Sequence, residues 1–235
     1  MNVLGISGSP RKEGNTAILV KEVLKHLRGK RNFISLAGLN INPCDSCDRC
    51  WKENVECVID DDIRWIIKEM EKADAIILGS PCYWGMVSAQ LKMLLDRSVS
   101  IYEKNTLKNK IGAVVVTHDV HGQAGWMAAV LIANFYNANG ILYAGRVIGE
   151  GGAEIGHVRK DKRAMRGAKE VAERMMELYE IMKGKQKKRD YKCLLRVCFS
   201  QGLQNRYFKP IFEAPRATNK QANPQNTRIT ITSPP

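Results

Sequence analysis

Residues 3–16 read VLGISGSPRKEGNT and decide the fold class of the chain. A short apolar run typical of a buried strand passes through a polar loop into a segment with helical spacing of apolar residues. This order of strand, loop and helix returns along the chain. Strands are expected at 3–6, 32–36, 75–79, 111–117 and from 141 onward. Helices are expected at about 19–27, 63–70, 88–96, 124–137 and 160–182. The alternation predicts an α/β protein with a doubly wound, five-stranded parallel sheet.

The ligand site of such a sheet is expected at one edge. Open parallel sheets bind ligands beyond the carboxyl ends of their strands, where the strand order reverses. The loops after the first, third and fourth strands are polar or rich in glycine. We expect these three loops to converge there.

The chain has 235 residues and a formal net charge of +13, most of which lies near its end. Residues 184–235 contain 11 Lys and Arg against 2 Asp and Glu. We expect one domain over 1–183 and a basic, largely disordered appendage over 184–235. Cys193 and Cys198 in this appendage match no ligand pattern. Because the body is close to neutral, we expect no nucleic-acid partner.

No apolar stretch approaches the roughly 20 residues needed to span a bilayer. The sequence MNVL at the start runs directly into the first strand, without the basic and apolar segments of an export signal. We therefore expect a cytoplasmic protein that does not contact membranes.

Four cysteines stand in fourteen residues: Cys44, Cys47, Cys50 and Cys57, in the pattern C-x2-C-x2-C-x6-C. Iron–sulfur clusters are held by four thiolates, and runs that begin C-x2-C-x2-C are typical of them. Zinc is the competing metal, but its ligands usually come as two separated pairs. A disulfide framework is a third interpretation, and the intracellular character of the chain disfavours it.

The loop after the first strand has the groups that bind phosphate. Ser7, Ser9, Arg11, Asn15 and Thr16 offer hydroxyls, an amide and a guanidinium at the start of a helix. The loop is neither a Walker A loop nor the dinucleotide motif G-x-G-x-x-G. Its groups suit a terminal phosphate monoester bound without magnesium, although a simple capped turn would use some of them too.

The loop after the third strand, residues 80–85, reads SPCYWG. Tyr83 and Trp84 can pack on a flat ring while backbone N–H groups meet its polar edge, although they could also be rim packing. Together with a phosphate loop on a neighbouring strand, this loop favours FMN as the ligand. Cys82 within it is interpreted as a small buried filler rather than a redox group.

At this point the chain resembles a known family. The residues that carry the resemblance are Gly8-Ser9-Pro10-Arg11, Gly14-Asn15-Thr16, Ser80-Pro81-Cys82-Tyr83-Trp84-Gly85, Gln90-Leu91-Lys92 and Asp96-Arg97. They look like the flavodoxin-like NADPH-dependent FMN reductases. The cysteine motif after the second strand narrows the resemblance to the iron–sulfur flavoproteins of anaerobic archaea and bacteria. The resemblance covers about residues 1–180.

The resemblance implies a flavodoxin-like fold with a cysteine-rich cluster loop after strand two. It also implies one FMN and one [4Fe–4S] cluster per subunit, and a homodimer or homotetramer. Members take electrons from ferredoxin and pass them to a small acceptor such as dioxygen, peroxide or a quinone. The implied ligands are Ser9, Arg11, Asn15 and Thr16 for the FMN phosphate, Pro81, Tyr83, Trp84 and Gly85 for its ring, and Cys44, Cys47, Cys50 and Cys57 for the cluster.

No protein side chain is expected to be catalytic in itself. His118 and His121 lie in a loop that only partly matches the family, and we interpret them as solvated rather than as proton donors. Two other functions stay open. One is an NAD(P)H-dependent FMN or quinone reductase with a structural metal. The other is a zinc-stabilised binding module without enzymatic activity.

Overall fold

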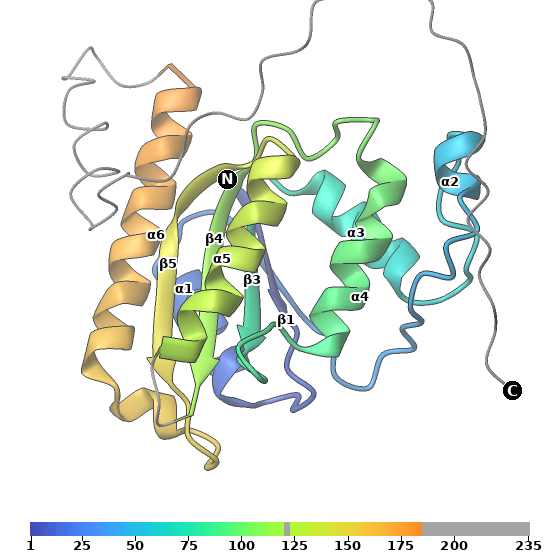
Figure 1. Ribbon diagram of the computed structural model, residues 1–235. Helices are drawn as coiled ribbons and strands as arrows, with labels where there is room; N and C mark the ends of the chain where they lie inside the picture. The colour runs from blue at the N-terminus through green and yellow to red at the C-terminus, as the bar shows by residue number, and fades with distance from the viewer. Residues whose placement is uncertain (120–122, 185–235) are drawn as a thin grey trace, which may run out of the picture. The chain divides into compact units, whose positions relative to one another are not determined.

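The computed structural model describes residues 1–119 and 123–184 (Figure 1), with only the backbone described for residues 123 and 124. The expectations for His121 and for the appendage beyond Gly184, with Cys193 and Cys198, lie outside the described residues.

Within the described residues, five strands form one parallel sheet. They are β1 Asn2–Ser7, β2 Lys30–Ser35, β3 Ala75–Pro81, β4 Ile111–His118 and β5 Leu142–Glu150. Their order in the sheet is β2-β1-β3-β4-β5, so the direction of chain progression reverses between β1 and β3. This order is that of the flavodoxin-like sheet, and it confirms the predicted doubly wound, five-stranded architecture.

In the described part of the chain, six α-helices and two 3-10 helices lie between the strands or after the last one. They are α1 Asn15–Lys25, α2 Arg49–Lys52, α3 Ile63–Lys72, α4 Ala89–Arg97, η1 Ser98–Ile101, α5 Gln123–Ala138, η2 His157–Lys160 and α6 Lys162–Met182. The sequence predicted the five long helices but not α2, whose four residues are too few to show a helical period. None of these described helices is long and apolar enough to cross a bilayer.

Helices cover both faces of the sheet because alternate strand residues are buried on opposite sides. Ile76 and Leu78 of β3 pack in a core with α3, α4 and α5. Ala75 and Ile77 of the same strand pack in a second core with α1 and α6. Figure 1 shows α4 and α5 in front of the sheet and α1 behind it.

The edge strand β5 is longer than the sequence indicated. An apolar start at 141–143 was the whole signal, yet the strand continues to Glu150. Its register shifts opposite Gly112 and Ala113, and only two of its residues are buried. β5 is an edge strand with a neighbouring strand on one side only, so it does not require a continuous apolar run. Its glycines and Arg146 interrupt the apolar pattern by which a strand is recognised in the sequence.

Candidate functional site

A cavity of about 580 Å³ lies at the carboxyl ends of β1, β3, β4 and β5. Its lining residues are Ser9, Arg11, Asn15, Thr16, Pro81, Cys82, Tyr83, Trp84, Thr117, His118, Asp119, Gly151, Gly152 and Ala153. The structure therefore brings together seven of the eight residues expected to bind FMN. Gly85 does not line the cavity, and it serves the turn described below.

The loop after β1 approaches its neighbours closely. The N–H of Gly8 donates to the carbonyl of Gly79 at 2.8 Å, and the Ser88 hydroxyl donates to the carbonyl of Gly8 at 2.6 Å. A Cβ at Gly8 would lie 2.6 Å from the Cβ of Leu91, so only glycine fits here. This packing fixes the loop that leads to the N-terminus of α1, where Gly14 supplies no capping side chain. The first-turn N–H groups of α1 are thus available to an anion.

Asn15 holds two loops together. Its amide nitrogen donates to the carbonyls of Gly151 and Glu154, and its oxygen accepts from the N–H groups of Gly156 and Val158. These bonds occupy both donors and both lone pairs of the amide. The side chain expected to bind phosphate therefore shapes the cavity through the loop after β5, and its part in the cofactor site stays a prediction.

Two other members of the phosphate loop have defined partners. The Arg11 guanidinium donates to the carbonyl of Ala153 at 2.8 Å and is otherwise exposed. The buried hydroxyls of Thr16 and Thr117 lie 2.6 Å apart, which joins the start of α1 to the end of β4. Arg11 therefore keeps donors that can face an anion in the cavity.

The aromatic loop ends in a tight hairpin turn. Tyr83 and Met86 exchange backbone hydrogen bonds of 3.0 and 2.9 Å, with Trp84 and Gly85 between them. Both central residues have positive φ, 52° for Trp84 and 78° for Gly85, as a type I′ turn requires. Glycine adopts such a φ freely, whereas for tryptophan it is strained. The turn presents the Trp84 ring, which is fully exposed, at the mouth of the cavity.

Two titratable side chains of the cavity were interpreted from the sequence. Cys82 is half-buried beside the core, and burial raises the pKa of its thiol, so it is protonated at neutral pH. This fits the filler role. The His118 ring lies at the end of β4 and bonds through Nδ1 to the carbonyl of Asp119.

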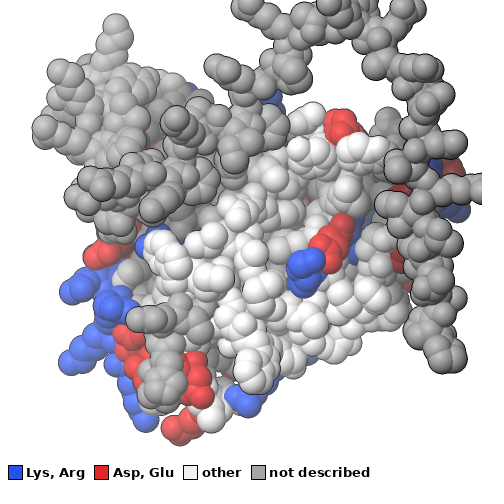
Figure 2. Space-filling model, in the orientation of Figure 1, with Lys and Arg blue, Asp and Glu red and all other residues white. Residues whose placement is uncertain are grey.

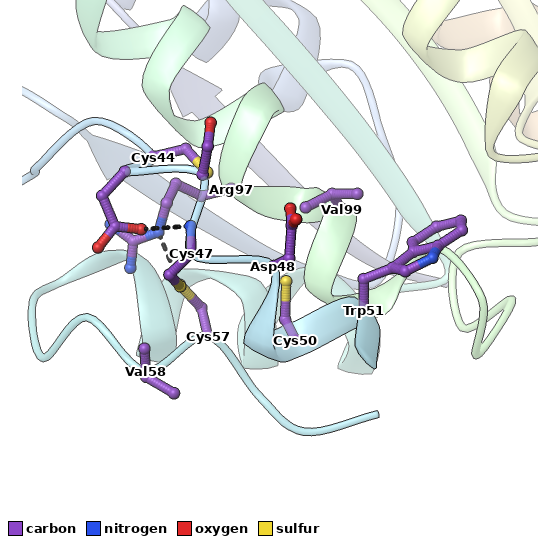
Figure 3. Close-up of a pocket in the computed structure, with 11 residues that line it drawn as sticks. Cys44, Cys47, Asp48, Cys50, Trp51, Cys57, Val58, Arg97 and Val99 are labelled. Carbon is purple, nitrogen blue, oxygen red and sulfur yellow. Dashed lines mark hydrogen bonds between the residues drawn. The ribbon is translucent and has the colours of Figure 1, made fainter. Parts of the chain in front are cut away.

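The four cysteines of the motif line a second, smaller cavity of about 150 Å³. It lies between β2 and α3, on a segment that includes α2 (Figure 3). The other lining residues are Asp45, Ser46, Asp48, Trp51, Val58, Arg97 and Val99. Arg97 reaches this cavity from the C-terminus of α4. The two cavities have no lining residue in common.

The donor set of this second cavity fits an iron–sulfur cluster in its chemistry. All four thiols are free of disulfides. Burial and the neighbouring Cys57 raise the pKa of the Cys50 thiol, so it is protonated at neutral pH in the absence of a metal, and a bound metal would favour its thiolate form. Within residues 1–119 and 123–184, however, no three Cys, His, Asp or Glu side chains lie close enough together to hold a metal ion. The loop gathers the thiols without converging them on one point.

Asp61 and Asp62 tie the two ends of this cysteine segment together. Asn40 N donates to Asp62 Oδ2 at 2.7 Å, and Asn42 N donates to Asp61 Oδ2 at 2.9 Å. Burial alone would raise the pKa of Asp61, but hydrogen bonds from Arg97 and from Asn42 N hold it below its ordinary value. The Asp61 carboxylate is therefore ionised at neutral pH.

The chain is similar to known proteins over most of its length. The family model of NADPH-dependent FMN reductases matches residues 1–152. An iron–sulfur flavoprotein of Methanocaldococcus jannaschii is 38% identical over 197 residues, which are 78% of this chain and 100% of that protein. Another, from Methanosarcina thermophila, is 32% identical and is matched over 81% of this chain and 100% of its own length.

The chain belongs to the iron–sulfur flavoproteins, a group within the FMN reductase family. It is therefore an FMN-dependent oxidoreductase. The Trp repressor binding protein from Bacillus subtilis shares the fold with a TM-score of 0.58 at 21% identity, covering 72% of this chain and 98% of that one.

The site of this iron–sulfur flavoprotein includes residues that sequence reasoning missed. Thr117, Asp119 and the segment 151–153 line the larger cavity, and Arg97 lines the smaller one. The pair Gly151-Gly152 after a strand was a usable signal, because paired glycines at a strand end allow close approach of a ligand. Arg97 belongs to the residues that carry the family resemblance, but the sequence did not indicate its role, because its hydrogen-bond partners lie 36 to 55 residues away along the chain.

Proposed function

We propose that the chain passes single electrons from ferredoxin, through a [4Fe–4S] cluster, to FMN and on to a small acceptor such as dioxygen, peroxide or a quinone. Cys44, Cys47, Cys50 and Cys57 would hold the cluster. The five described cysteines are all unpaired, as is usual in the reducing cytoplasm where we expect the protein to work.

One observation carries this proposal: a single chain has two separate cavities with different donor sets. The smaller is lined by four thiols, which suit iron and sulfide. The larger lies where flavodoxin-like sheets bind FMN, and it joins hydroxyls and a guanidinium to two aromatic rings. A cluster exchanges one electron at a time while a flavin holds one or two, so the pair would link one-electron donors to two-electron acceptors.

The side chains of the larger cavity would orient FMN. Ser9, Arg11 and the N-terminus of α1 offer donors for the phosphate. Pro81, Tyr83 and Trp84 provide apolar surface for the ring system, and Gly85 permits the turn that presents it. In this arrangement no side chain acts as a nucleophile. The protein would bind and orient the two groups.

Cofactor analysis tests the proposal directly. The full chain, purified without oxygen, is expected to contain about four iron, about four acid-labile sulfide and about one FMN per chain. Cys47→Ser is expected to lower the iron and sulfide content. Cys82→Ser, a cysteine outside the smaller cavity, is expected to leave it unchanged. A colourless protein with one zinc per chain would instead support the binding module.

A second candidate function differs in the electron donor. The family description names NADPH, and an NAD(P)H dehydrogenase (quinone) of Brucella anthropi is 42% identical over 57 residues, 24% of this chain. Under anaerobic conditions, the bleaching of the flavin by reduced ferredoxin and by NADPH can be compared on the same preparation. Faster reduction by NADPH would favour an NAD(P)H-dependent reductase in which the metal is structural.

A homodimer or homotetramer is the proposed assembly, and the exposed side of α5 supports it. None of the 16 residues of this helix is charged. Trp126, Met127 and Val130 leave more than a third of their surface exposed. Figure 2 shows that the described surface over α4 and α5 is mostly uncharged, as expected of a surface that contacts a second copy.

A further inference from the structure

Arg97, the last residue of α4, is a charged side chain with no exposed surface. Its ion-pair partner Asp61 also has a fully buried side chain, and the two lie 2.8 Å apart. Charged residues are almost never fully buried unless they are paired. The other ion pair of α4, between Lys92 and Asp96, is exposed on both sides. Arg97 is thus set apart from the surface charges of its own helix.

Every N–H of the Arg97 guanidinium has a partner. Nη1 donates to Asp61 Oδ2 at 2.8 Å and to the carbonyl of Asn42 at 2.9 Å. Nη2 donates to Asp61 Oδ1 at 3.1 Å and to the carbonyl of Ile59 at 3.2 Å. The fifth donor, Nε, points at Cys57 Sγ from 3.0 Å (Figure 3). Only the planar fork of arginine can make this set of five bonds.

These partners lie on both sides of the cysteine motif. Asn42 stands two residues before Cys44, and Ile59 stands two residues after Cys57. Arg97 therefore closes the base of the loop that carries all four thiols, and it anchors that loop to α4. The N-terminus of the same helix is fixed to the loop after β1 by the Ser88 hydroxyl bond to Gly8.

We propose that Arg97 positions Cys57 as a cluster ligand and, through its N–H···S hydrogen bond, raises the reduction potential of the cluster. This inference rests on the proposed function, because it requires that Cys57 binds the cluster. Asp61 orients the guanidinium and cancels part of its charge. Arg97 is a positioning residue, because it contacts the cysteine ligand Cys57 and would not contact the electron donor or acceptor of the cluster.

The physical reason is the extra negative charge of the reduced cluster. Reduction adds one electron, and part of its charge resides on the thiolate sulfurs. A hydrogen bond from a buried cation to one of those sulfurs is stronger in the reduced state than in the oxidised state. Hydrogen bonds to sulfur and local net charge are among the factors that set cluster potentials. Removing the bond therefore lowers the potential, and removing only Asp61 raises it.

Three variants separate these effects. R97Q/D61N removes both charges together, so no buried charge is left unpaired. R97K keeps the charge but loses the fork. D61N keeps the Arg97 donors and removes the charge that opposes them. The matched control is K92Q/D96N, which removes an exposed ion pair from the same helix. The measurements are the midpoint potential of the cluster, by anaerobic redox titration, and the rate of iron release to a chelator.

We expect R97Q/D61N to have a more negative midpoint potential than the wild type and to release iron about 10- to 100-fold faster. D61N shifts the potential in the opposite direction, and K92Q/D96N shifts neither quantity. If R97Q/D61N does not fold, as judged by its circular dichroism and FMN content, R97K decides, with faster iron release expected.

Two outcomes overturn the proposal, and they differ. A fully loaded R97Q/D61N with the potential and iron release of the wild type would show that Arg97 has only a structural role; the same result for R97K would count equally. Wild-type protein that holds FMN but no iron or sulfide would instead contradict the proposed function, and the role of Arg97 would fall with it.

Discussion

Arg11, in the loop after β1, is a cation that lines the larger cavity. One of its N–H groups donates a hydrogen bond to the carbonyl of Ala153. FMN differs from riboflavin by its phosphate, so a phosphate ligand should affect only the binding of FMN. We predict that Arg11→Gln weakens FMN binding about tenfold, as expected for loss of one charge-assisted hydrogen bond, and leaves riboflavin binding unchanged. Quenching of flavin fluorescence by the apoprotein measures both affinities.

Lys12 is the matched control for Arg11, because it is an adjacent exposed cation that does not line the cavity. Lys12→Gln is expected to change neither affinity by more than about twofold, since exposed charges are screened by solvent. If Arg11→Gln weakens riboflavin and FMN equally, Arg11 acts by shaping the loop at Ala153 and not by binding phosphate.

Among the elements, α6 depends on one carboxylate at its N-terminus. Asp161 Oδ1 accepts from Arg163 N at 3.0 Å and Ala164 N at 2.9 Å, and Oδ2 accepts from Glu150 N at 3.0 Å. Asp161 thus caps the helix and ties it to the end of β5. We predict that Asp161→Ala lowers the free energy of unfolding by about 1 kcal/mol at neutral pH, measured by urea denaturation.

The pH dependence of this cap has a defined sign. Burial alone would raise the pKa of Asp161, but the hydrogen bonds from Ala164, Glu150 and Arg163 hold it below the ordinary value. A lowered pKa gives stability that is complete above the unfolded value of about 3.9 and is lost as the pH falls through the folded value. The penalty of Asp161→Ala therefore shrinks below about pH 4. Asp96→Ala, which removes an exposed pair, should cost less than about 0.5 kcal/mol at any pH.

How far these elements follow from the sequence depends on what buries them. The strands β1, β3 and β4 are buried over nearly all their residues, so continuous apolar runs mark them within one or two positions. The edge strand β5 and the exposed helix α2 lack that signal. The spacing of the four cysteines predicts a cluster site, and the structure places all four around one cavity, while their role as cluster ligands stays a prediction.

Contacts between distant loops did not follow from the sequence. The sequence predicts Asn15 to be a phosphate ligand because its neighbours are hydroxyls and an arginine. The hydrogen-bond partners that the structure gives Asn15 lie 136 to 143 residues away, and no local pattern encodes them. The same holds for Arg97, whose sulfur contact spans 40 residues.

At the scale of the whole molecule, α5 has an uncharged outer face with exposed apolar side chains, which would be in contact with water in a monomer. The inner side of the helix packs Ala128, Ile132 and Tyr136 into the core. Its outer side keeps Met127 and Val130 exposed, and Trp126 stacks against the guanidinium of Arg146 at 3.9 Å. A helix that is apolar on its outer side as well is usually covered, and in a homo-oligomer a second copy covers it.

A charge in the middle of this face should therefore break the assembly without unfolding the protein. We predict that Met127→Glu shifts the protein from oligomer toward monomer in light scattering coupled to size-exclusion chromatography, because the carboxylate would be buried unpaired at the contact. Met182→Glu is the control, since Met182 has similar exposure at the end of α6. Circular dichroism should show the same helix content for both variants. An unchanged oligomer mass for Met127→Glu would show that the subunits contact each other through another surface. A monomeric wild-type protein would contradict the proposed assembly altogether.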